Sequence, residues 1–131
     1  MIHYSTLIQK AIEAKQHAVA PFSNFRVGAA LVTENNKIYT GCNIECSSYS
    51  LTICAERVAL FKALSEGERQ FESLAIVTDA RELCPPCGAC RQVLWDFAQN
   101  ITIVLARDQE DFTVMKLSEL FPNAFSSKYL G

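Results

Sequence analysis

Three cysteines that begin two separate predicted helices constrain this chain more than any other feature. Cys54 begins the largely apolar helical segment 54–66, and Cys87 and Cys90 form a Cys-x-x-Cys pair at the start of segment 88–98. A pair with this spacing at a helix start can direct both sulfurs toward one point. If the two helices pack side by side, all three sulfurs converge. The fold must therefore bring two helix N-termini together.

Three converging thiolates predict a zinc site with one open position. A helix N-terminus favours the thiolate form, which is the form that binds zinc. Three protein ligands leave a fourth tetrahedral position for water, as in catalytic zinc sites. Glu56 follows Cys54 by two residues, so its carboxylate can stay off the metal and accept a proton from that water. Because three thiolates more than neutralise a divalent ion, the water needs this base. Arg57 and Arg91, each next to a ligand, are candidates to donate to the sulfurs.

Other uses of the same cysteines stay open at this point. Cys84 and Cys87 form a second Cys-x-x-Cys pair, which could be a redox pair. A four-cysteine structural zinc site could also recruit Cys84 or Cys46. Outside such sites, Cys42 and Cys46 are predicted as packed or free thiols. These readings explain the cysteines without a role for Glu56.

The hydrophobic pattern predicts alternating helices and strands. Helices are predicted at residues 4–18, 54–66, 88–98 and 117–121, and strands at 25–33, 37–43, 73–79 and 101–106. Gly28 and Gly41 lie inside two of these strands, where a glycine often marks either a bulge or a close approach of the backbone to another part of the molecule. The last strands are linked by helices, which favours parallel pairing. The pattern therefore predicts an α/β sheet layered by helices.

Length and composition limit the classes of function. The chain has 131 residues, half of them apolar, which predicts a single domain over residues 1–131 with its own core. Lys and Arg number 12 and Asp and Glu 14, and the formal charge of -2 disfavours a nucleic-acid partner. We see no secretory signal and no apolar run long enough to span a membrane. We therefore expect a cytoplasmic protein, in which thiols stay reduced.

The motifs resemble those of the zinc-dependent cytidine deaminases in their three-cysteine form. The matching strings are Phe25-Arg26-Val27-Gly28-Ala29-Ala30, Gly41-Cys42-Asn43-Ile44-Glu45, Cys54-Ala55-Glu56-Arg57, Cys87-Gly88-Ala89-Cys90-Arg91-Gln92 and Leu120-Phe121-Pro122-Asn123-Ala124-Phe125. They span nearly the whole chain in the order and spacing of the family. The sequence departs from many relatives at Cys46 and Ile53, where Asn is expected, which puts in doubt only the packing of the loop between them.

The resemblance implies a fold and a reaction. The fold would be a three-layer α/β/α sandwich with a mixed, about five-stranded sheet, assembled as a homotetramer with one zinc ion per subunit. The reaction would be hydrolytic deamination of cytidine and deoxycytidine to uridine and deoxyuridine with release of ammonia, as in pyrimidine salvage. The partner would be a small nucleoside, with no nucleic acid and no membrane.

The resemblance also assigns the residues of the zinc centre. Cys54, Cys87 and Cys90 would bind the metal, and Arg57 would support their thiolates. Glu56 would carry a proton from the zinc-activated water to the ring N3 and then to the leaving amino group.

Five further residues would bind the nucleoside by the same resemblance. Asn43 and Glu45 would hold the ribose hydroxyls, and period-two spacing at a strand end does place both side chains on one side. Phe25 would stack on or near the pyrimidine, and the backbone around Ala55 would read the base edge. Phe125 would close the pocket of a neighbouring subunit. Without a zinc site, Asn43 would be a turn residue and Glu45 a solvated charge. Phe25 could equally be a core aromatic, and Phe125 could equally be an ordinary interface residue.

Three rival functions remain at this stage. A deaminase of a modified nucleoside such as blasticidin S would share the zinc motif and the short length. A polynucleotide deaminase usually has His in place of Cys54 and a basic groove. A non-catalytic zinc protein would not need Glu56. The pair Asn43-x-Glu45, the net charge and the third cysteine favour a deaminase of ordinary cytidine nucleosides.

Overall fold

A mixed five-stranded sheet forms the centre of the molecule. The computed structural model describes residues 2–131, so Met1, the first residue of the predicted domain, lies outside the described part. The sheet has the order β2-β1-β3-β4-β5, in which β3 and β4 pair in parallel and the other neighbours are antiparallel. The strands are β1 Val27–Thr33, β2 Ile38–Cys42, β3 Phe71–Thr78, β4 Thr102–Ala106 and β5 Phe112–Lys116. The parallel pair is the one connected through a helix, as expected.

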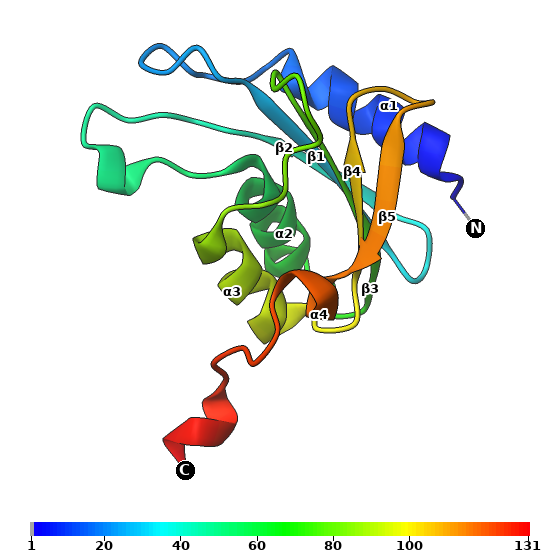
Figure 1. Ribbon diagram of the computed structural model, residues 1–131. Helices are drawn as coiled ribbons and strands as arrows, with labels where there is room; N and C mark the ends of the chain where they lie inside the picture. Colours follow the sequence, from blue (N-terminus) through cyan, green and yellow to red (C-terminus); the bar gives the residue numbers. More distant parts are fainter. Residues whose placement is uncertain (1) are drawn as a thin grey trace.

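Helices cover both faces of the sheet. Helix α1 (Tyr4–Lys15) packs on one face, and α2 (Ala55–Ser65) and α3 (Gly88–Phe97) pack on the other (Figure 1). The short helix α4 (Leu117–Leu120) and the 3-10 helices η1 (Tyr49–Leu51) and η2 (Ser127–Leu130) lie outside these layers. Two separate apolar clusters, one for each face, fill the spaces between helices and sheet. The predicted three-layer α/β/α sandwich is therefore confirmed.

Two glycines let helices approach the sheet closely. A Cβ atom added at Gly28 would lie 2.0 Å from the carbonyl oxygen of Ala11 in α1, and one at Gly41 would lie 2.4 Å from that of Ala55 in α2. Both contacts are far shorter than van der Waals distance, so only glycine fits at either position. Of the two alternatives for these glycines, a bulge or a close backbone approach, the structure shows the close approach at both positions. Gly41 also fixes the first turn of α2, where Cys54 and Glu56 are found.

The predicted elements differ from the observed ones by one to three residues at one or both ends, and three differences stand out. Helix α1 ends at Lys15 rather than at residue 18, and its N-cap is His3. Strand β1 begins at Val27 rather than at residue 25, because side chains of other segments hold the backbone of the loop before it. The hydrophobic pattern did not predict β5, whose side chains are half-buried or exposed. An edge strand with so little burial carries no clear alternation of apolar and polar residues.

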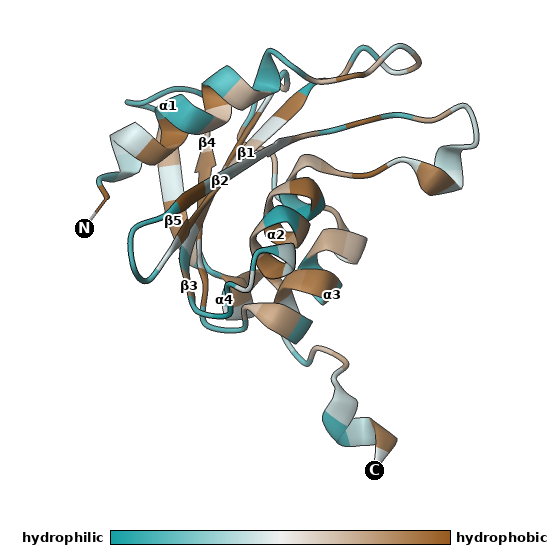
Figure 2. Cartoon of the chain, turned by 180° about the vertical axis from the view of Figure 1, so that it is seen from behind, coloured by the Kyte–Doolittle hydropathy of each residue, from teal (hydrophilic) through white to brown (hydrophobic). Residues whose placement is uncertain are grey.

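Two apolar segments extend away from the sandwich. The loop that carries η1 and the C-terminal segment that carries η2 both project from the body, and each shows apolar residues near its tip (Figure 2). Their exposed large side chains are Tyr49, Leu51, Phe125, Tyr129 and Leu130. No helix among residues 2–131 has the length and apolar character that a bilayer crossing needs.

Candidate active site

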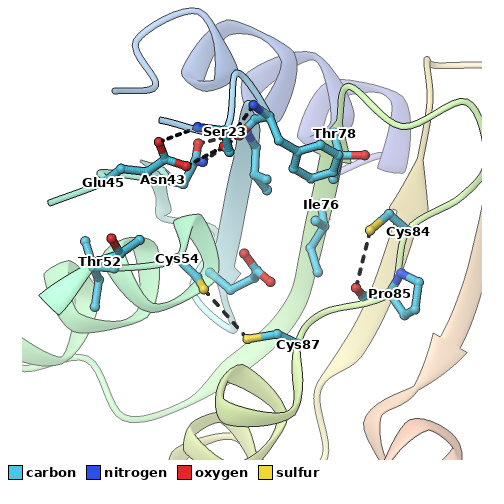
Figure 3. Close-up of a pocket in the computed structure, with 14 residues that line it drawn as sticks. Ser23, Asn43, Glu45, Thr52, Cys54, Ile76, Thr78, Cys84, Pro85 and Cys87 are labelled. Atoms are coloured by element: carbon cyan, nitrogen blue, oxygen red, sulfur yellow. Dashed lines mark hydrogen bonds between the residues drawn. The ribbon is translucent and has the colours of Figure 1, made fainter. Parts of the chain in front are cut away.

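A cavity of about 320 Å³ opens at the N-termini of α2 and α3 (Figure 3). Its wall comes from the loop before β1, the ends of β1 and β3, the segment after β2, and the two segments that begin α2 and α3. The floor includes the apolar side chains of Val27 and Ile76. The polar groups that reach it include Asn43, Glu45 and Glu56. A small apolar cavity with a few convergent polar groups is typical of a site for a small ligand.

The sulfurs of Cys54, Cys87 and Cys90 converge at one side of this cavity. They lie within 4.8 Å of one another, with 3.7 Å between Cys54 and Cys87 and 3.3 Å between Cys87 and Cys90. Zinc–sulfur bonds of about 2.3 Å in a tetrahedral site would separate the sulfurs by about 3.8 Å. The three sulfurs therefore fit one zinc ion with a fourth position open.

The convergence follows from where the helices begin. Cys54 is the N-cap of α2 and Cys87 is the N-cap of α3, so both sulfurs lie at the positive ends of helix dipoles. Cys90, one turn into α3, is fully buried. Because α2 and α3 pack against the same face of the sheet, their first turns meet. Cys84 and Cys46 lie outside this group, which disfavours a four-cysteine structural site.

The charges around the sulfurs fit a bound cation. The pKa of Cys54 is lowered to about 5, first by a hydrogen bond with Cys90 and also by the guanidinium of Arg57, whose Nη2 lies 3.3 Å from the Cys54 sulfur. Burial of Cys54 opposes this effect. The pKa of Cys90 is raised, first because its thiol donates a hydrogen bond to the Cys54 sulfur. Burial of Cys90 and the nearby carboxyl of Glu56 raise it further. Several thiolates this close repel one another, and a divalent cation removes that conflict.

Arg57 is placed to support the thiolates. Its Nε is the one side-chain nitrogen or oxygen among residues 2–131 that is buried without a hydrogen-bond partner. Such an atom is costly unless a negative group lies close by. A permanent cation with a spare donor beside three sulfurs suits a centre that carries net negative charge when zinc is bound.

Glu56 is almost fully buried in the first turn of α2 and lines the cavity beside Cys54 and Cys87. The pKa of its carboxyl is raised to about 7, first by burial and also by the nearby Cys54 sulfur. A zinc ion at the thiolates would oppose this rise, since a positive charge favours the ionised carboxylate. A carboxyl that titrates near neutral pH can both accept and return a proton.

Asn43 and Glu45 line the opposite part of the cavity (Figure 3). Asn43 is buried, and its Nδ2 donates to the carbonyl oxygen of Phe25 at 2.8 Å while its Oδ1 accepts from the N–H of Val27 at 2.9 Å. Glu45 accepts hydrogen bonds at both carboxylate oxygens from the loop that contains Ser23. Both side chains therefore organise the loop before β1 as well as reaching the cavity.

The other predicted nucleoside residues are placed differently from one another. Phe25 lines the cavity, with about a third of its surface exposed. Ala55 is fully buried in the core behind the cavity wall, as the first residue of α2. Phe125 lies on the projecting C-terminal segment, stacked on Tyr129 at 5.9 Å between ring centres, and is not part of the cavity wall of its own chain.

Sequence reasoning placed Arg91 wrongly and missed Ser23. Arg91 does not donate to a sulfur: its Nε donates to the carbonyl oxygen of Pro86 at 2.9 Å and its Nη1 to that of Leu120 at 2.6 Å. It therefore connects the start of α3 to the end of α4. Ser23 lines the cavity and contacts Glu45, but a serine in a loop carries no sequence signal for such a role. Cys84 also lines the cavity, with its thiol 3.7 Å from the carbonyl oxygen of Pro85.

Known proteins have similar sequences and a similar fold. The family model for the cytidine and deoxycytidylate deaminase zinc-binding region matches residues 1–106. The cytidine deaminase of Sporosarcina psychrophila is 46% identical over 126 residues, which cover 95% of this chain and 93% of that protein. The cytidine deaminase of Halalkalibacterium halodurans is 46% identical over 123 residues, 93% of each chain. The 1.6 Å crystal structure of the cytidine deaminase from Burkholderia pseudomallei superposes with a TM-score of 0.91 at 44% identity, covering 95% of this chain and 100% of that one. This chain therefore belongs to the cytidine and deoxycytidylate deaminase family of zinc-dependent hydrolases.

Proposed function

We propose that this protein hydrolyses the 4-amino group of cytidine and deoxycytidine, giving uridine or deoxyuridine and ammonia. The observation that carries the proposal is the position of Glu56, a buried carboxyl beside three convergent sulfurs at one end of a small cavity. Family membership and the names of the relatives support cytidine as the substrate. The length of the chain supports one domain over residues 1–131. The six cysteines are free thiols, which supports a reducing compartment such as the cytoplasm.

The chain's own residues divide the chemical work. Cys54, Cys87 and Cys90 hold the zinc ion, and zinc bound there supplies the Lewis acidity that makes a water molecule nucleophilic. Glu56 accepts the proton of that water and gives it to N3 of the pyrimidine as C4 becomes tetrahedral. It then moves the second proton of the water to the 4-amino group, so that ammonia leaves and the ring gains a carbonyl oxygen. A carboxylate that lies beside the zinc ligands and off the metal can transfer protons in both directions.

The opposite part of the cavity would hold the sugar and the base. Asn43 and Glu45 present an amide and a carboxylate that can bond two adjacent ribose hydroxyls. Phe25 lies at the cavity wall, where an aromatic ring can pack against a pyrimidine. The backbone at Ala55, which directly follows Cys54 at the start of α2, would contact the base edge.

We also propose a homotetramer in which Phe125 of one subunit closes the cavity of another. The support is apolar surface: Phe125, Tyr129 and Leu130 are exposed on a segment that leaves the body, and Tyr49 and Leu51 are exposed on the loop beside the cavity. Large exposed apolar patches are uncommon on a monomer. Sedimentation equilibrium should give four times the mass of the chain, and a monomer that deaminates cytidine at the same rate would contradict this assembly.

The substrate is tested with the purified zinc-loaded protein. We expect a fall in the absorbance of cytidine with release of one ammonia per nucleoside, and much slower reaction with blasticidin S or a cytosine-containing single-stranded oligonucleotide. Activity on blasticidin S without activity on cytidine would assign the chain to the modified-nucleoside deaminases instead.

A further inference from the structure

The carboxylate of Glu45 is held at both oxygens by one turn of the loop before β1. The backbone N–H groups of Phe22 and Ser23 donate to its Oε1 at 2.9 Å and 3.1 Å. The hydroxyl of Ser23 donates to Oε2 (Figure 3). Two neighbouring residues therefore supply three donors to one carboxylate.

A fourth contact orients the hydroxyl itself. The Oγ of Ser23 accepts a hydrogen bond from the backbone N–H of Phe25 at 3.0 Å. With a lone pair occupied in this way, the hydroxyl proton is free to point at Glu45. The carbonyl oxygen of Phe25 is held in turn by Asn43, so the turn is fixed at both ends.

This arrangement leaves the carboxylate with one defined acceptor direction. An ionised carboxylate accepts about four hydrogen bonds. Three are taken by the turn, and Glu45 and Ser23 both line the cavity. The hydroxyl of Ser23 is also the largest cause that lowers the pKa of Glu45, with the backbone N–H groups adding to it and burial opposing it. Glu45 therefore stays an acceptor at neutral pH.

We propose that Ser23 is a positioning residue for nucleoside binding, which fixes the carboxylate of Glu45 so that its remaining acceptor direction meets a sugar hydroxyl. This inference rests on the proposed function, because it takes Glu45 to be the group that binds the ribose. Ser23 need not touch the nucleoside. Its effect passes through Glu45 and belongs to binding rather than to proton transfer at Glu56.

The first test compares KM with kcat for cytidine. Ser23→Ala removes the donor to a charged acceptor, and we expect KM to rise about tenfold with kcat within about twofold of the wild type. Ser23→Thr keeps the hydroxyl at an exposed position and should stay close to the wild type. Ser65→Ala, an exposed serine at the far end of α2, is the matched control and should change neither constant. A fall in kcat at unchanged KM for Ser23→Ala would overturn the proposal.

A double-mutant cycle with Glu45→Ala separates positioning from general stability. If Ser23 acts through Glu45, Ser23→Ala should lower kcat/KM about tenfold in the wild type but less than about twofold in the Glu45→Ala background. Calorimetry of uridine binding to the wild type, the two single variants and the double variant gives the same comparison without turnover, which helps where a variant is slow. If Ser23→Ala lowered kcat/KM by the same factor in the wild type and in the Glu45→Ala background, the positioning role would be contradicted. Wild-type protein that does not deaminate cytidine would instead overturn the proposed function, and this shows before any variant is compared.

Discussion

The two sides of the cavity are built in different ways. On the zinc side, Cys54, Glu56 and Cys87 belong to the starts of two helices that are packed on the sheet, and Ala55 between them is fully buried. On the nucleoside side, Phe25 and Glu45 lie in irregular segments held by hydrogen bonds between side chains and backbone. Helices position reacting groups more accurately than loops do, whereas loops carry binding groups that tolerate adjustment. Changes on the zinc side should therefore act mainly on kcat or on folding, and changes on the nucleoside side mainly on KM.

The largest effect is expected at Glu56. Glu56→Gln keeps the shape of the side chain but removes the proton carrier, so kcat for cytidine should fall by about 10²–10⁴-fold or more, with zinc still bound. Steady-state kinetics and metal analysis of the same sample check this. Glu66→Gln, at the other end of α2, is the control and should leave both quantities unchanged. Wild-type turnover in Glu56→Gln would remove Glu56 from the mechanism.

Gly41 tests how the zinc side depends on packing. In Gly41→Ala the new Cβ would collide with the backbone of α2 at Ala55 and Ala59, and backbone cannot yield as a side chain can. We expect a loss of about 1–3 kcal/mol in the free energy of unfolding, together with weaker zinc binding. Urea unfolding with a zinc titration measures both.

Gly88→Ala provides the matched glycine control, because a Cβ there meets open space at the start of α3. Its stability should stay within about 0.5 kcal/mol of the wild type. If Gly41→Ala and Gly88→Ala lost the same free energy of unfolding, the close contact at Gly41 would not set the position of α2.

Glu45 tests the nucleoside side. Glu45→Gln removes the charge that accepts from the turn and, by our proposal, from the sugar. KM for cytidine should rise about tenfold while kcat and the melting temperature change little, since the side chain is only partly buried. Glu34→Gln, in the exposed turn between β1 and β2, should have no effect on KM. A large drop in kcat at constant KM would break the division between the two sides.

The smallest effect concerns Asp79, which anchors the loop beside Phe25. Burial alone would raise its pKa, but hydrogen bonds from Arg26 and Lys15 outweigh burial and lower the pKa to about 2. The pKa of Asp79 in the folded protein lies below its value of about 3.9 in the unfolded chain, so the ionised carboxylate stabilises the fold. This stabilisation is present above about pH 4 and is lost as the pH falls toward about 2. Asp79→Asn should cost about 1 kcal/mol at pH 7 and progressively less in that window.

Urea unfolding at several pH values measures the effect of Asp79→Asn. The control is Asp111→Asn, which breaks a more exposed ion pair with Arg107 and should cost a few tenths of a kcal/mol at most. If Asp79→Asn lowered the free energy of unfolding by the same amount at every pH, then packing rather than charge would explain how Asp79 stabilises the fold.

The sequence predicted the zinc side of the molecule more fully than the nucleoside side. Cys54, Cys87 and Cys90 could be grouped because their helix starts and their spacing are local features, and Gly41 marked the close approach that brings α2 to the sheet. The partner of Glu45 could not be predicted, since Ser23 meets it only through the folding of two irregular segments. Arg91 was misplaced because adjacency to Cys90 in sequence does not fix the direction of a long side chain. Strand β5 was missed because an exposed edge strand lacks a burial pattern.

The central claim is that zinc held by Cys54, Cys87 and Cys90 activates a water molecule for hydrolysis of cytidine, and that Glu56 transfers the protons of that water. The most direct measurement follows zinc content and cytidine turnover in one sample through removal of the metal by a chelator and stepwise return of zinc. We predict one zinc per chain at full activity, loss of turnover in proportion to the zinc removed, and recovery as zinc returns. Full turnover by metal-free protein, or one zinc per chain without cytidine turnover, would contradict this account.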